Sequence, residues 1–151
     1  MTGAAGGAPG ASEASGDPGG NQARAELTAR CNAIEEAYEF MLAYASQGLP
    51  NEQGSVSGSQ IRQFLNRCDE GLSGLAELLS EYVRATRGDQ APPHLAFIRV
   101  LARDAADAQA AIQMVLAQPS IGSQMIDNLN ASMHLRALLT DLFLIDEILK
   151  P

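Results

Sequence analysis

The pattern of apolar and polar positions along this chain is helical from about residue 23 to residue 149. In the segment of about 23–47, apolar side chains repeat in steps of four and three residues: Leu27, Cys31, Ile34, Tyr38, Met41 and Ala45. The same periodicity returns in the segments of about 58–87, 93–117 and 120–149. Because this spacing places apolar side chains on one face of a helix, it predicts four amphipathic helices.

Turn and capping residues separate the four predicted helices. Ser57 and Gln60 fit a capping box, which would satisfy two free amides at the start of the second helix. Consecutive helices joined by short loops lie antiparallel, so we predict an all-α, up-down-up-down antiparallel four-helix bundle. The residues that mark the predicted connections are Gly48 and Pro50, Gly88 and Pro93, and Pro119.

Two glycines interrupt the second predicted helix. Gly71 and Gly74 lie beside its apolar line, and each glycine costs about 1 kcal/mol relative to alanine inside a helix. We therefore expect that they allow a neighbouring helix to approach closely.

The N-terminal segment, residues 1 to 21, differs from the rest of the chain. It is composed almost entirely of glycine, alanine, serine, proline and acidic residues, and Met1 is its one large apolar side chain. Such a segment buries too little apolar surface to offset the entropy lost on ordering. The sequence therefore predicts a disordered tail, followed by one bundle domain over residues 22–151.

The balance of charge excludes several classes of partner. The formal net charge is −8 and the isoelectric point is near 4.6, whereas nucleic acids and anionic lipids are bound by basic surfaces. No apolar stretch reaches the roughly 18 residues needed to span a bilayer. The N-terminus also lacks the pattern of a signal peptide. We expect a cytoplasmic protein that binds neither nucleic acid nor membrane.

His134 is the one candidate for catalysis. Asp127 and Asn130 precede it by seven and four residues, so one continuous helix would place all three in one quadrant. Histidine phosphotransfer domains are also acidic four-helix bundles, but they carry lysine three and glycine four residues after the histidine. Ala137 and Leu138 occupy those positions here. A histidine-dependent, phosphotransfer-like activity is therefore the weaker alternative, and an enzyme is not the expected class.

The sequence predicts neither a metal nor a cofactor. A di-iron bundle needs glutamate three residues before each histidine, but Ala91 precedes His94 and Ala131 precedes His134. Met41, Met114, Met125 and Met133 fall on or beside the predicted core lines. Cys31 and Cys68 are too few for a disulfide framework and are expected to be reduced core residues.

The last predicted helix has more apolar residues than one face can hold. Leu138, Leu142, Ile145 and Leu149 form its core line. Leu139, Phe143, Leu144 and Ile148 flank that line, and Phe40 and Tyr44 similarly flank the core line of the first helix. Apolar side chains beyond the needs of the core are typical of an interface.

From this excess we predict a non-catalytic helical interaction module, such as a homodimer, an assembly chaperone or a regulatory adaptor. Its interface would consist of Leu139, Phe143, Leu144 and Ile148 with Phe40 and Tyr44. The alternative is a small-molecule site inside the bundle beside Ala105 and Ala108, lined by Tyr38, Leu72 and Met133. Small residues on facing helices can leave room for a ligand.

Overall fold

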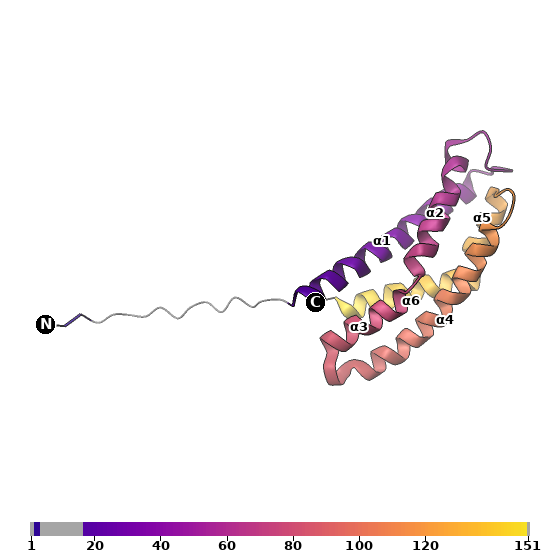
Figure 1. The fold of residues 1–151 in the computed structure, drawn as a ribbon. Helices are drawn as coiled ribbons and strands as arrows, with labels where there is room; N and C mark the ends of the chain where they lie inside the picture. Colours follow the sequence, from indigo (N-terminus) through magenta and orange to yellow (C-terminus); the bar gives the residue numbers. More distant parts are fainter. Residues whose placement is uncertain (1, 4–16, 151) are drawn as a thin grey trace.

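A computed structural model of the chain describes residues 2–3 and 17–150. Every regular element in that part is a helix, which confirms the all-α prediction. The helices lie side by side in an elongated bundle, with the start of the first helix beside the C-terminal end (Figure 1). Their bounds are α1 (Pro18–Ser46), α2 (Val56–Leu72), α3 (Leu75–Arg87), the 3₁₀ turn η1 (Gly88–Gln90), α4 (Ala91–Leu116), α5 (Ser123–Ala131) and α6 (Met133–Leu149).

Helix α1 begins earlier than the predicted residue 23. The Asp17 carboxylate accepts hydrogen bonds from the amides of Gly19 and Gly20, at 3.1 and 3.2 Å. Pro18 occupies the first helical position, where its fixed φ is favourable and its missing amide proton costs nothing. The last residues of the predicted tail are therefore helical. The rest of that prediction, residues 1 and 4–16, lies outside the described residues.

The second predicted helix is two helices, because the chain breaks at Ser73 and Gly74. Gly74 has a φ of +72°, a left-handed conformation that favours glycine. The guanidinium of Arg30 on α1 donates a hydrogen bond to the Ser73 carbonyl at the break. Gly71 does allow a close approach, since a Cβ there would lie 3.1 Å from Ile34 Cγ1 and 3.4 Å from the Arg30 carbonyl oxygen.

The fourth predicted helix is also two helices, and it begins at Ser123 rather than at residue 120. Ser132 interrupts it with an extended backbone, φ −63° and ψ 139°. The Ser132 hydroxyl accepts a hydrogen bond from the Leu135 amide at 3.3 Å, so this residue caps α6. The break changes which side chains of α5 and α6 share a face.

The start of α2 is capped differently from the prediction. Ser55, rather than Ser57, is the N-cap, and its hydroxyl accepts a hydrogen bond from the Gly58 amide at 2.9 Å. The predicted capping box of Ser57 and Gln60 is therefore wrong by two residues. Gly58 is in the first turn of α2 and packs directly against the backbone of Glu52.

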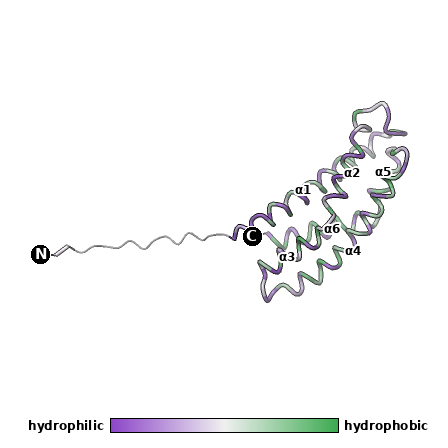
Figure 2. Tube along the Cα trace, viewed as in Figure 1, coloured by the Kyte–Doolittle hydropathy of each residue, from purple (hydrophilic) through white to green (hydrophobic). Residues whose placement is uncertain are grey.

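Hydrophobic and hydrophilic stretches alternate along the helices (Figure 2), and buried apolar side chains of α1 to α6 form one core cluster. Helix α1 contacts α2, α3 and α5, while α4 contacts α2, α3 and α6. On α4 the predicted core line is confirmed throughout. Its buried members are Ile98, Leu101, Ala105, Ala108, Ile112 and Val115.

Across residues 2–3 and 17–150, none of the helices combines the length and the apolar character that a bilayer crossing requires.

We predict that Gly58→Ala lowers the free energy of unfolding by about 1–3 kcal/mol. Glycine-to-alanine changes inside helices usually raise stability by about 1 kcal/mol. Here the new Cβ would overlap the backbone carbonyl group of Glu52, which cannot rotate away as a side chain could. Urea unfolding followed by circular dichroism measures the change.

Gly20→Ala is the matched control, because a Cβ at that position would meet only the Asp17 side chain, at 3.5 Å or more. This variant should be as stable as the native chain or more so. Equal stabilities for both alanine variants would contradict the packing of the α1–α2 loop on α2.

Candidate functional site

The structure divides the four predicted interface residues of the last helix into two groups. Leu139 is 5% exposed and belongs to the core, so its side chain is not part of an exposed surface. Phe143, Leu144 and Ile148 are 56%, 48% and 46% exposed. These three large apolar side chains lie within two turns of one helix.

The two aromatic residues predicted on the flank of α1 are engaged inside the chain. Tyr44 is fully buried, and its hydroxyl donates a hydrogen bond to the Ile121 carbonyl at 2.5 Å. The Phe40 ring stacks on Phe64 of α2, with the ring centroids 4.1 Å apart. Tyr44 therefore belongs to the core, whereas Phe40 is partly buried and packs against the core from its edge.

Residues of α4 extend the exposed apolar patch of α6. Pro93, Phe97 and His94 form a groove with Ile145 and Ile148, with a volume of about 140 Å³. Val100, one turn after Phe97, is 36% exposed. By helical spacing, Leu144 lies one turn from both Ile148 and Asp141, whereas Phe143 is about 140° around α6 from Ile148. We define the apolar patch as Phe97, Val100, Leu144 and Ile148.

Acidic residues continue the same surface along the bundle. Asp141 of α6 lies against Asp104 of α4, and His134 Nδ1 lies 4.0 Å from the Asp107 Oδ2. Asp141 is three residues before Leu144, and Asp104 is four residues after Val100. We define the acidic patch as Asp104, Asp107 and Asp141, and the two patches together as the α4–α6 face.

The contact between Asp104 and Asp141 is unfavourable when both carboxylates are ionised. Burial, a hydrogen bond with Asp104 and the Asp104 charge together raise the pKa of Asp141 from 3.8 to about 7. Two ionised carboxylates are both acceptors, so they can share a hydrogen bond only when one of them carries a proton. The enclosed Asp141 Oδ2 has no donor among the described residues. The pair therefore favours a proton or another cation between α4 and α6.

The structure does not bring His134 together with Asp127 and Asn130. Asp127 and Asn130 line a groove of about 450 Å³ between α1, α5 and the start of α6, where Arg136 also lies. Asn130 is buried, and its side-chain amide donates to the Met41 carbonyl at 3.1 Å. His134 instead lies beside Asp107 of α4. The candidate catalytic set is separated because Ser132 breaks the helix on which it was placed.

The described residues hold no group of three or more histidine, cysteine or acidic side chains arranged to bind a metal. Both cysteines are free thiols. Burial, followed by the charges of Asp146 and Glu35, raises the pKa of Cys31 to about 11. Burial, with the charge of Asp69, raises the pKa of Cys68 to about 12. Both environments disfavour the thiolate, the reactive form of cysteine.

The alternative ligand site inside the bundle is not formed as predicted. Ala105 and Ala108 are buried in the core, which leaves their methyl groups packed against neighbouring helices. Met133 is 81% exposed and cannot line an interior cavity. Met114 is exposed as well, so the core assignment of these two methionines is corrected.

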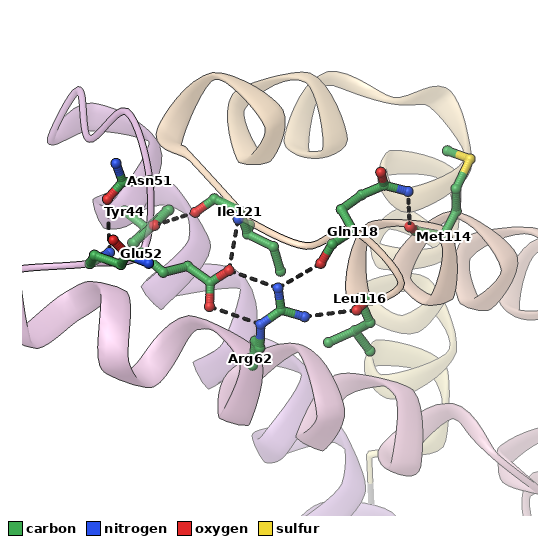
Figure 3. Close-up of polar contacts among 9 residues, drawn as sticks. Tyr44, Asn51, Glu52, Arg62, Met114, Leu116, Gln118 and Ile121 are labelled. Carbon is green, nitrogen blue, oxygen red and sulfur yellow. Dashed lines mark hydrogen bonds and ion pairs between the residues drawn. The ribbon is translucent and has the colours of Figure 1, made fainter.

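A second cluster of polar residues joins the two loops at one end of the bundle, and we call it the polar clasp (Figure 3). Arg62 of α2 donates two hydrogen bonds to the Glu52 carboxylate, at 2.8 and 2.7 Å. It also donates to the carbonyls of Leu116 and Gln118, each at 2.7 Å. Glu52 in turn accepts a hydrogen bond from the Ile121 amide at 2.8 Å.

Ser123 extends the clasp to the end of α1. Its hydroxyl donates to the Tyr44 carbonyl at 2.6 Å and accepts from the Leu49 amide at 2.8 Å. The hydrogen bonds from Arg62 hold the pKa of Glu52 below its usual range despite its burial. These groups satisfy each other completely, so the clasp is structural. Sequence reasoning missed it because its members are far apart along the chain.

We predict that Arg62→Met lowers the free energy of unfolding by about 2 kcal/mol. The change removes the donors for the Glu52 carboxylate and for two loop carbonyls, while methionine keeps most of the side-chain volume. Chemical denaturation measures the loss. Lys150→Met is the control, since it removes an exposed ion pair with Glu147 and should leave stability unchanged. Equal effects of the two changes would contradict the role of the clasp.

A second prediction concerns the pH dependence of stability. The folded chain holds a proton on Asp141 up to about pH 7, whereas the unfolded chain releases it near pH 4. The folded state therefore binds more protons over this interval, and the contribution of Asp141 to stability is lost as the pH rises through it. The side chain that Asp141→Asn introduces cannot ionise. The melting temperature of this variant minus that of the native chain should therefore be larger at pH 8 than at pH 5.

Thermal unfolding across pH 4–8 tests this expectation. Asp127→Asn, a change of the same kind at an exposed carboxylate, should follow the native pH profile. Parallel profiles for the native chain and Asp141→Asn would show that the Asp104–Asp141 pair is not strained.

No protein-family model, curated protein or solved structure matches this chain. Function must therefore be argued from the side chains that the fold leaves unsatisfied. The clasp, the stacked aromatic rings and the cysteines all have partners or enclosure inside the bundle. The strongest candidate functional site is the α4–α6 face.

Proposed function

We propose that this protein is a non-catalytic interaction module that docks a protein partner on its α4–α6 face. The observation that carries the proposal is the exposure of Leu144 and Ile148 beside Val100 and the groove at Phe97. Apolar side chains scattered singly on a surface need no explanation, but a contiguous patch of several is typical of an interaction site.

The core of the bundle does not depend on these side chains. The inner line of α6 is completed by Leu135, Leu138, Leu142 and Ile145, all of which are buried. An exposed leucine or phenylalanine adds little to folding and adds a risk of aggregation. These exposed apolar side chains are accounted for if a partner covers the patch.

The buried polar groups support an interaction role over a catalytic one. The buried Asn130 and Ser123 each bond to a backbone carbonyl of α1, and Tyr44 bonds to the α4–α5 loop. These groups position helices, whereas a catalytic group must keep a donor or acceptor available to a substrate.

We also infer that the helices are four rods of an up-down-up-down bundle, two of which are broken. In this arrangement α2 with α3 forms the second rod, and α5 with α6 forms the fourth. The contacts of α1 with α2, α3 and α5, and of α4 with α2, α3 and α6, support it. The α4–α6 face is then the outer surface between the third and fourth rods.

The proposal predicts that Leu144→Glu leaves the free energy of unfolding within about 0.5 kcal/mol of the native value, while it removes the ability of the α4–α6 face to bind. Leu142→Glu, only two residues away but buried, should instead unfold the chain. Chemical denaturation gives the stabilities. Binding of an apolar fluorescent dye, reduced in Leu144→Glu, reports the exposed patch.

Size-exclusion chromatography with light scattering then separates the kinds of partner. A native dimer that Leu144→Glu converts to a monomer identifies a second copy as the partner. A native monomer points to a different protein. Strong destabilisation by Leu144→Glu together with a monomeric native chain would overturn the proposal, because the patch would then serve folding.

A further inference from the structure

We infer that the partner of the α4–α6 face is a basic amphipathic helix, with apolar side chains for the apolar patch and lysine or arginine for the acidic patch. The inference rests on the proposed function and adds the chemistry of the partner. It is carried by the juxtaposition of the two patches along one pair of helices.

The apolar patch has the shape that a helix can occupy. Pro93, Phe97 and Ile148 line a groove between the start of α4 and the end of α6. Leu144 and Val100 continue the exposed apolar surface toward the middle of both helices. A helix that lies in such a groove anchors itself through side chains spaced three, four and seven residues apart.

The acidic patch continues the surface in the same direction. Asp141 and Asp104 lie together between α6 and α4, and Asp107 follows one turn later along α4, beside His134. Arg103 of α4 lies one turn before Asp107 but about 100° around the helix axis from Asp104. No basic residue of α4 lies three or four positions from Asp104, so a basic partner would supply the counter-charge of the Asp104–Asp141 pair.

The dimensions of the face match a short helix. From Ile148 to His134 the face spans fourteen residues of α6, which is about 21 Å at 1.5 Å per residue. A docked helix of about four turns would cover both patches, with its apolar half over Leu144 and Ile148 and its basic half over Asp104 and Asp107.

A second copy of the chain fits this face less well. A two-fold axis along the helices would set the acidic patch of one copy over that of the other, and an axis across the helices would set it over the other copy's apolar patch. The chain has 18 acidic and 10 basic residues, and like charges at an interface disfavour association. The strained Asp104–Asp141 pair would gain from a cation and would lose from another carboxylate.

A displayed library of helices tests the inference. Each helix carries apolar residues at positions i, i+3, i+4 and i+7, and lysine, glutamine or glutamate at random elsewhere. The library is selected on the full native chain and counter-selected on Leu144→Glu. We expect enrichment of helices with lysine one or two turns from the apolar positions, and no enrichment of their glutamate counterparts.

The enriched helix is then measured by fluorescence anisotropy. Asp104→Asn with Asp107→Asn should weaken its binding about twofold to tenfold, and added salt should weaken it further. Glu36→Gln with Glu39→Gln, the same change of charge on the exposed side of α1, should have no effect.

Each remaining outcome overturns the inference. Enrichment without regard to charge, or equal binding of the lysine and glutamate versions, would exclude electrostatic selection by the acidic patch. A native dimer that depends on Leu144 would assign the face to a second copy and would leave the proposed function intact. If no helix is enriched and the native chain is a monomer, both the inference and the proposed function are overturned.

Discussion

The ion pair between Arg62 and Glu52 is the interaction on which the arrangement of the helices depends. Arg62 is in the second turn of α2, and Glu52 is in the loop before it. Their hydrogen bonds reach Leu116 at the end of α4, and Gln118 and Ile121 in the α4–α5 loop. The Arg62 guanidinium thus joins α2, the α1–α2 loop and the α4–α5 connection at one end of the bundle. Because both side chains are enclosed on several sides, their hydrogen bonds are stronger than those of an exposed ion pair.

Two of the predicted helices are continuous and two are broken. Helices α1 and α4 run without a break, whereas the chain breaks at Gly74 between α2 and α3 and at Ser132 between α5 and α6. Each break is stabilised by a specific bond, from Arg30 to the Ser73 carbonyl and from the Leu135 amide to the Ser132 hydroxyl. The second break turns α6 away from the direction of α5, so that α6 packs mainly on α4.

The helices were predictable from sequence because their core lines are local. The line from Ile98 to Val115 was correct at every position, since a period near 3.6 is set by the helix itself. The break at Ser132 was missed because a serine inside a helix is common and because Leu129 and Met133 continue the helical spacing across it. On α1 the burial of Tyr44 was missed because its hydroxyl partner, the Ile121 carbonyl, is 77 residues away. The exposure of Leu144 and Ile148 was predictable from the excess of apolar residues, whereas their acidic neighbours on α4 depend on how α4 packs on α6.

The two ends of the molecule therefore differ in how their polar groups are used. At the loop end, Arg62 and Ser123 satisfy almost every nearby acceptor, which makes that end rigid and leaves it little to offer a partner. On the α4–α6 face, Asp141 lies against a like charge and Leu144 and Ile148 lie half in solvent. Both features are unfavourable in the isolated chain, and one docked helix with apolar and basic side chains would relieve both. Exposed apolar side chains and adjacent carboxylates are two chemically different sources of unfavourable free energy on one surface. Because the same partner would remove both, this surface is the one to which we assign a function.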